Sequence, residues 1–220
     1  MPLVEMVGAN GVGKSTLAAA LLAGEPEDGW KDLQSLVIDA ARFEEPLPPP
    51  YPHLIEGKAR WLAAQGAPPE VIARASETSV HRAWRDHMVR AENPELLLLS
   101  DEHVLQHFCG EVLDLAVQEP AMARTFLDRR FVMYLENTPA NILANLKTRT
   151  AGGAAMREEA VVRDVTRFQQ RLREFGHVLH ALGGTCIVLD MQQGLAACEA
   201  QARLFLADVK MLAEAGAGSA

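Results

Sequence analysis

The sequence is poor in the features that define several classes of protein. It has three cysteines and 5% aromatic residues, and its longest apolar runs fall far short of the roughly 18 residues needed to span a membrane. Cys109, Cys186 and Cys198 form no C-x-x-C pair and leave an odd one over, which predicts buried packing thiols in a reducing compartment. So few aromatic residues argue against an extended stacking platform for single-stranded nucleic acid.

Positive charge is also scarce. The 220 residues include 29 acidic and 21 basic side chains, for a net charge of -8, and only five of the basic residues are lysines. A broad surface for nucleic acid or an anionic membrane is therefore not expected, and any phosphate-binding charge must be local. The first residues, Met1–Val7, have no basic stretch before the apolar one. This argues against a signal or transit peptide, and we expect a cytoplasmic protein.

Short apolar runs alternate with helical patterns along the chain. Runs of this kind are typical of strands buried on both faces of a parallel sheet, and they lie at Leu3–Val7, Leu36–Ile38, Leu96–Leu99, Phe131–Leu135 and Cys186–Leu189. Between Val161 and Leu182, apolar residues recur at spacings of three and four, as on one face of a helix. The sequence predicts a single α/β domain over 1–220, a five-stranded parallel sheet sandwiched by helices.

The segment 46–92 is too long for a minimal crossover between the second and third strands. Proline excludes a helix interior or a central strand from Pro46–Pro52, which we expect to be extended, and helices are predicted at Ile55–Gln65 and Pro69–Arg90. This helical insertion either builds part of a substrate site or is a purely structural helical pair. The tail 213–220 consists mostly of small residues and is expected to be flexible.

One motif stands out from the rest of the sequence. Gly8–Thr16 reads GANGVGKST, which satisfies G-x-x-x-x-G-K-[ST] between a predicted strand and a predicted helix. Glycines let the backbone turn its N–H groups toward phosphate oxygens, and a helix N-terminus favours the anion. Lys14 is expected to bridge the β- and γ-phosphates and Ser15 to bind Mg²⁺. The predicted phosphate-binding residues are Gly8, Asn10, Gly11, Val12, Gly13, Lys14, Ser15 and Thr16.

A second acidic element follows the Leu-rich strand. Asp101 comes directly after it, where a carboxylate can hold a metal-bound water or orient an acceptor, although it could equally cap the next helix. Glu102 could activate water, which keeps open a second function, an ATP-dependent hydrolase or switch that acts through partners. His103 and His107 share a helical face without a third metal ligand, so they are expected to be surface or supporting residues, with His103 a candidate for touching substrate.

On these residues the chain resembles the small-molecule and nucleotide kinases of the P-loop class, the group of thymidylate kinase, deoxynucleoside kinases and adenylylsulfate kinase. The resemblance rests on Gly8–Thr16, the segment Ile38–Arg42, the strand that ends at Asp101, and Tyr134–Arg163. It implies a nucleoside-monophosphate-kinase-like fold and transfer of a phosphoryl group from ATP with Mg²⁺. Asp39 would orient the acceptor and Arg42 would grip an anionic substrate. A strand-end Asp followed by Arg is also common in surface turns.

The resemblance further implies a lid, which we expect at 147–160. The glycine-containing stretch there lies between Arg149 and Arg157, which would stabilise the transferring phosphate, with Lys147 and Arg163 behind them. A solvated helical hairpin is the alternative for this segment.

The acceptor is not inherited from the resemblance. Thymidylate kinase has Asp-Arg and deoxynucleoside kinases have Glu-Arg-Ser where Asp101-Glu102-His103 stands here. We expect a small acceptor, a nucleoside or nucleotide, with Glu102 and His103 on its side of the site. The alternative acceptor is a hydroxyl carried by nucleic acid, which the negative net charge disfavours. Binding it would require a local basic groove on one predicted helix, lined by Arg74, Arg82, Arg85 and Arg90. Tyr134–Pro139 lacks the guanine clamp of GTPases. No membrane partner is expected, and a homodimer stays open.

Overall fold

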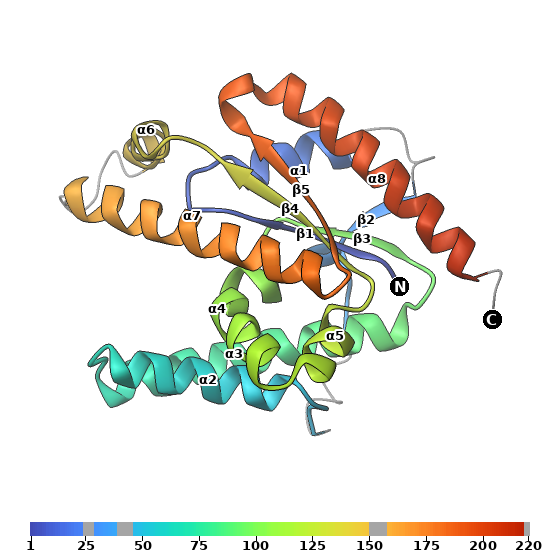
Figure 1. Cartoon of the computed structure of the whole chain (residues 1–220). Helices are drawn as coiled ribbons and strands as arrows, with labels where there is room; N and C mark the ends of the chain where they lie inside the picture. The colour runs from blue at the N-terminus through green and yellow to red at the C-terminus, as the bar shows by residue number, and fades with distance from the viewer. Residues whose placement is uncertain (24–28, 39–45, 150–157, 218–220) are drawn as a thin grey trace.

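A computed structural model describes residues 1–23, 29–38, 46–149 and 158–217 of the chain. Its centre is a five-stranded parallel sheet in the order β2-β3-β1-β4-β5 (Figure 1). The predicted fold class is therefore confirmed. The strands are β1 (Leu3–Val7), β2 (Trp30–Asp32), β3 (Leu97–Ser100), β4 (Arg130–Glu136) and β5 (Thr185–Asp190).

The second strand is not where the sequence predicted it. β2 pairs Trp30 with Leu97 at the sheet edge, whereas Leu36–Ile38 is irregular. The strand ends at Asp32, whose carboxylate accepts a hydrogen bond of 2.9 Å from the backbone N–H of Gln34 and starts a 3-10 turn, η2 (Leu33–Ser35). Val37 is 96% exposed between two half-buried neighbours. A short apolar run can thus be a loop in which only alternate side chains are buried.

Helices cover both faces of the sheet. They are α1 (Lys14–Leu22), α2 (Tyr51–Ala64), α3 (Pro69–Glu92), α4 (Val104–Gln118), α5 (Pro120–Leu127), α6 (Pro139–Arg149), α7 (Glu158–Ala181) and α8 (Leu195–Ala217). α1 and α8 lie on one face, α4 and α7 lie on the other, and the α2–α3 pair forms a further layer against α4 (Figure 1). This pair fills most of the segment 46–92.

Two predicted boundaries are wrong. Tyr51 and Pro52 already belong to the first turn of α2, where proline is tolerated, so the extended run ends at Pro50. The tail predicted from 213 is helical through Ala217, because alanine and glutamate are good helix formers. The remaining tail residues lie outside the described ranges.

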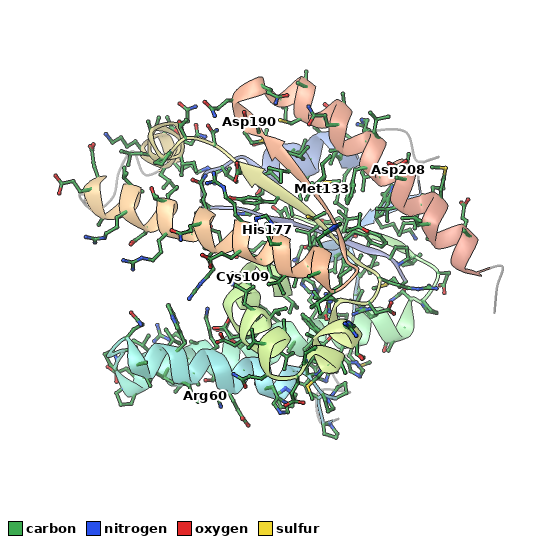
Figure 2. All side chains as sticks on the ribbon, in the orientation of Figure 1. Arg60, Cys109, Met133, His177, Asp190 and Asp208 are labelled. Atoms are coloured by element: carbon green, nitrogen blue, oxygen red, sulfur yellow. The ribbon has the colours of Figure 1, made fainter. Side chains whose placement is uncertain are left out.

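The alternation of side chains along each strand separates two apolar cores. Val4 and Met6 of β1 face the core under α1 and α8, while Val7 faces the core under α4 and α7. Figure 2 shows Met133 within the sheet and Arg60 and Asp208 on the outer helices. Cys109 and Cys198 are buried as expected, whereas Cys186 on the edge strand is half-buried. Within the described ranges, no helix combines the length and apolar character needed to cross a bilayer.

Charged side chains occupy the interior between β1, β4 and the helical layers. The guanidinium of Arg130 donates to Glu5 at 2.7 Å, and it also pairs with Asp86 on α3. Asp86 accepts from Tyr51 and lies 2.8 Å from the ring nitrogen of His103. These five side chains are each at most 5% exposed. Arg130, with His103, holds the pKa of Asp86 well below its usual value despite burial.

Candidate functional site

The segment Gly8–Thr16 forms a loop between the buried strand β1 and the helix α1. Gly11 and Gly13 have φ values of 84° and 115°, in the left-handed region that other residues rarely adopt. Gly8 is required for another reason, because a Cβ there would lie 2.8 Å from the carbonyl oxygen of Leu135. The strand–loop–helix context of the motif is therefore present, with the N-terminus of α1 directly after Gly13.

Lys14 is the cation of this loop. Its Nζ donates to the carbonyl oxygen of Gly8 at 2.7 Å, and the side chain is largely buried. Burial lowers the pKa of Lys14, while the nearby carboxylates of Glu102 and Asp101 oppose that shift. Arg149, at the end of α6, lowers the pKa further by its like charge. Four predicted site residues thus share one electrostatic environment.

The loop is held by two amides that the sequence reasoning missed. Gln106 of α4 makes a pair of hydrogen bonds with Gly8, accepting from its N–H at 3.0 Å and donating to its carbonyl at 3.1 Å. Asn145 of α6 donates to the carbonyl of Gly11 at 2.8 Å. No local pattern signals either residue, because each contact joins positions about a hundred or more apart in the sequence.

The acidic pair follows β3 at the carboxyl edge of the sheet. Asp101 is half-buried, whereas the Glu102 carboxylate lies 3.1 Å from His107 and 3.9 Å from Arg82. Burial, together with the charges of Arg82 and Lys58, lowers the pKa of His107 to about 4, so its ring is neutral near pH 7. Arg82 is then the fixed charge nearest to Glu102.

His103 lies inside the buried network and not beside the loop. The residue is 2% exposed and its ring nitrogen lies 2.8 Å from Asp86, so it is not accessible to a ligand. This corrects the expectation that His103 touches substrate. The physical reason is that Asp86, on α3, offers a buried carboxylate to the first residue before α4. Glu5 reinforces the same turn by accepting a hydrogen bond from the backbone N–H of Leu105 at 2.8 Å.

Several predicted residues lie outside the described ranges. Asp39, Arg42 and Arg157 are among them, as is the middle of the expected lid. The two ends of that lid are helical. Lys147 in α6 forms an ion pair of 2.5 Å with Glu158 at the start of α7, and both side chains are exposed.

The arginines of α3 do not form an open basic groove. Arg85 donates to the carbonyls of Leu33 and Leu36, and Arg90 donates to the carbonyl of Asp128 at 2.7 Å. Arg82 is paired with Glu102. These side chains hold η2 and the α5–β4 connection to α3, so they are not a free surface for nucleic acid.

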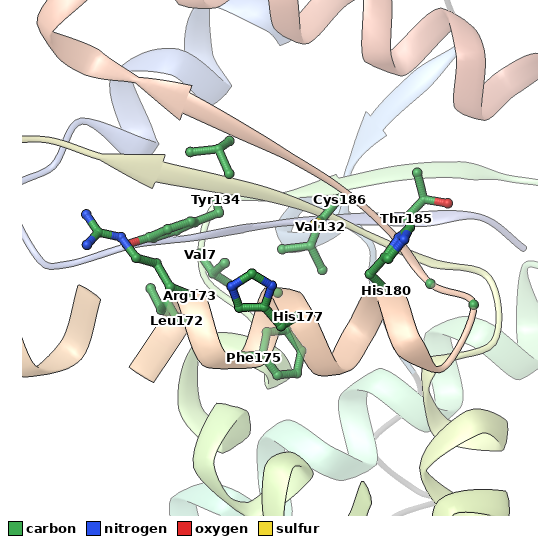
Figure 3. Close-up of a pocket in the computed structure, with 14 residues that line it drawn as sticks. Val7, Val132, Tyr134, Leu172, Arg173, Phe175, His177, His180, Thr185 and Cys186 are labelled. Atoms are coloured by element: carbon green, nitrogen blue, oxygen red, sulfur yellow. The ribbon is translucent and has the colours of Figure 1, made fainter. Parts of the chain in front are cut away.

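Three cavities of the structure are candidate binding sites for small molecules. A cavity of about 270 Å³ borders the loop at Ala9 and Asn10 and continues to Asp164 and Phe168 of α7. A cavity of about 670 Å³ between α2 and α7 shares those last two residues. The largest, about 710 Å³, lies between α7 and the edge strand β5 (Figure 3), and none of its lining residues belongs to the phosphate loop.

The described residues include no group of three or more His, Cys, Asp or Glu side chains arranged to hold a metal. Magnesium beside a phosphate loop needs only one or two protein ligands, because phosphates and waters supply the others. Ser15, in the first turn of α1, is exposed, and Asp101 is close enough to act on the pKa of Lys14. This oxygen donor set fits magnesium.

Comparisons with known proteins give similarity only among solved structures. No family model and no curated protein matches the chain. The chain is similar to a deoxyadenosine kinase from M. mycoides with bound dCTP, at 14% identity and a TM-score of 0.47, covering 94% of this chain and 99% of that one. The same enzyme with bound dATP gives 13% identity and a TM-score of 0.43, covering 93% and 98%. The residue assignments therefore rest on the contacts described above.

Proposed function

We propose that this chain is a phosphotransferase that moves the γ-phosphoryl group of ATP, with Mg²⁺, to a hydroxyl or phosphate of a small acceptor, a nucleoside or nucleotide. One observation carries the proposal. The loop Gly8–Thr16 combines left-handed glycines, the start of a helix and a lysine whose ammonium lies within the loop. Backbone N–H groups and Lys14 would bind the phosphates, so catalysis would proceed by positioning and charge neutralisation.

The charges around the loop support roles for further residues. Ser15 and Asp101 would hold Mg²⁺, which when bound neutralises the developing charge on the phosphates. Arg149 lies near enough to Lys14 to lower its pKa, and we propose that it stabilises the transferring group together with Arg157. Asp39 would orient the acceptor hydroxyl, and Arg42 would bind an anionic part of the acceptor.

Hydrolysis is the rival reaction, since it would use Glu102 to activate water. Against it, the Glu102 carboxylate already contacts His107 and Arg82, and its backbone carbonyl accepts from Gln34 at 3.2 Å. A carboxylate held by these contacts is less free to reach and orient an attacking water. A nucleic-acid acceptor is also disfavoured, because Arg85 and Arg90 donate to backbone carbonyls of the chain itself and are not free to bind its phosphates.

The test is transfer of label from γ-labelled ATP, with Mg²⁺, to separate pools of nucleosides, nucleotides, other metabolites and DNA. We expect an organic phosphate in a nucleoside or nucleotide pool, and a loss of at least about a hundredfold in rate for Lys14→Ala. Lys31→Ala, at an exposed position of β2, is the matched control and should keep the wild-type rate. Label that reaches only inorganic phosphate with every pool would exclude a kinase.

A further inference from the structure

A groove lies between the C-terminal end of α2 and the middle of α7. Figure 1 shows that both helices extend past α4. Its cavity of about 670 Å³ is lined by Trp61 on one side and by Arg167 and Arg171 on the other. Asp164 and Phe168 line both this cavity and the smaller one at the phosphate loop. A molecule whose reacting group lies at the loop could therefore extend into this groove.

Arg171 is held in a fixed orientation at the base of the groove. A Cβ on Gly110 of α4 would lie 3.2 Å from both Cζ and Nη1 of Arg171 and 3.5 Å from Nε. These distances mean that the guanidinium occupies the space that any side chain at position 110 would need. The Trp61 ring centroid is 5.7 Å from Cζ, within the range of a cation–π contact. The planar group is thus oriented before any ligand binds.

Arg171 and Arg167 line this cavity without a carboxylate partner among the described residues. Arg130, Arg173 and Arg203 each form an ion pair of this kind. Within the described ranges, no carboxylate pairs with Arg167 or Arg171, although they lie one helical turn apart and repel each other. Asp164 and Glu174 also line the cavity, but neither forms an ion pair with these two arginines, so both guanidinium groups can donate to an anion that enters it.

The alternative role for Arg171 is to compensate a buried carboxylate. Glu111 of α4 is 7% exposed, and the charge of Arg171 does lower its pKa against the effect of burial. Lys58, however, lies 3.7 Å from Glu111 and has the larger effect on that pKa. Glu111 therefore has a nearer cation in Lys58, and none of the carboxylates that the structure describes forms an ion pair with Arg171.

We infer that this groove binds the acceptor of the proposed phosphoryl transfer, and that the acceptor carries a phosphate or carboxylate on a planar ring system. Arg171 receives the anion, with Arg167 beside it. The ring packs against Phe168 and the exposed part of Trp61, which is 38% exposed. The role of this ligand as the phosphoryl acceptor rests on the proposed function. The anion site itself can be tested by binding measurements without turnover.

The experiment is calorimetric titration of the full chain with its phosphate loop filled by a non-hydrolysable ATP analogue and Mg²⁺. Matched pairs distinguish the two anions: nucleosides against their 5′-monophosphates, and nicotinamide against nicotinate. In at least one of these two pairs, the anionic member should bind at least tenfold more tightly than its neutral partner. Arg171→Gln should abolish that advantage, Arg171→Lys should restore part of it, and Arg124→Gln, at an exposed position of α5, should retain it.

The outcomes separate this inference from the proposed function. If Arg171→Gln binds each anion as the wild type does, the anion site is wrong even when phosphoryl transfer is observed. If transfer occurs, Arg171→Gln should raise the KM for the acceptor by tenfold or more while kcat changes less than about twofold. ATP hydrolysis without transfer to any acceptor would overturn the proposed function alone, because the binding titration is read without turnover.

Discussion

Arg130 is buried with two carboxylates, Glu5 and Asp86, and this arrangement determines where the first turn of α4 lies. Glu5 stands alone as a charged residue in the apolar strand Leu3–Val7. It bonds Arg130 with one oxygen and the N–H of Leu105 with the other. Asp86 similarly joins Arg130 to His103. The acidic pair Asp101-Glu102 precedes this anchored turn, so the network positions it.

Removing one charge from the network should destabilise the fold strongly. Asp86→Asn leaves the guanidinium of Arg130 with a single carboxylate in a fully buried site. Breaking a buried ion pair from one side costs about 3–5 kcal/mol, so we expect the free energy of unfolding to fall by about that amount. Urea denaturation measures it. Asp208→Asn, at an exposed position of α8, should change stability by less than about 0.5 kcal/mol, and an equal effect of the two substitutions would contradict the network's role.

His107 should make stability depend on pH. Its pKa falls from 6.5 to about 4 on folding because burial disfavours the imidazolium and Arg82 and Lys58 repel it. Between those values the unfolded chain binds more protons than the folded one, so stability is complete above about pH 6.5 and is lost as the pH falls toward 4. The loss attributable to this group is on the order of 2 kcal/mol.

His107→Gln removes that titration while the other acidic groups remain. The wild type should therefore lose more stability than the variant between pH 6.5 and 4, measured by denaturant unfolding at each pH. Parallel curves for the two proteins would show that His107 is not buried in its neutral form.

At the level of single residues, the sequence predicted the phosphate loop because its chemistry is local. Glycines at left-handed positions and a lysine before a hydroxyl all lie within nine residues, Gly8–Thr16. Glu5 offered a weaker signal, since a lone charge in a buried strand requires a partner. Arg130 could not be identified from the sequence, as it lies 125 positions away.

Among the elements, α4 and α6 fix the phosphate loop from outside. Gln106 and Asn145 bond the backbone of Gly8 and Gly11, so the loop is shaped by helices that follow β3 and β4. These helices follow the carboxyl ends of the two strands that flank β1 in the sheet. The loop is therefore ordered by the sheet topology as well as by its own glycines.

Loss of the Gln106 amide should weaken nucleotide binding. Gln106→Ala leaves the N–H of Gly8 without its acceptor and removes a donor from the carbonyl of Gly8. Two hydrogen bonds at about 1 kcal/mol each predict a rise of about tenfold or more in the Kd for ATP. Titration with a labelled ATP analogue measures it. Gln118→Ala, at an exposed position of the same helix, is the control, and equal affinities in the two variants would mean that the anchor is irrelevant.

The sequence predicted the elements best where the apolar pattern was long or continuous. Leu3–Val7 is identical to β1, and the α7 pattern falls within Glu158–Ala181 except at its last residue. β2 was misplaced because Leu36–Ile38 is as apolar as a strand, yet the cap at Asp32 ends β2 before it. The start of α2 was missed because proline at a helix N-terminus looks the same in sequence as proline in an extended run.

For the molecule as a whole, charge is distributed so that a negative chain presents cations at one edge of the sheet. Lys14 lies in the loop, Arg149 ends α6, and Arg167 and Arg171 continue along α7 beside the cavities. The net charge alone predicted only that positive charge must be local. The groove between α2 and α7 could not be derived from the sequence, because it depends on how two helices separated by nearly a hundred residues are placed by α4.

The most direct test of the central claim is the fate of the γ-phosphoryl group in a single turnover. The chain, in excess over γ-labelled ATP and with Mg²⁺, is mixed with a pool of nucleosides and nucleotides, and the labelled products are separated at short times. We predict that label moves to an organic phosphate faster than to inorganic phosphate. Label found solely as inorganic phosphate at all times would contradict phosphoryl transfer to an acceptor.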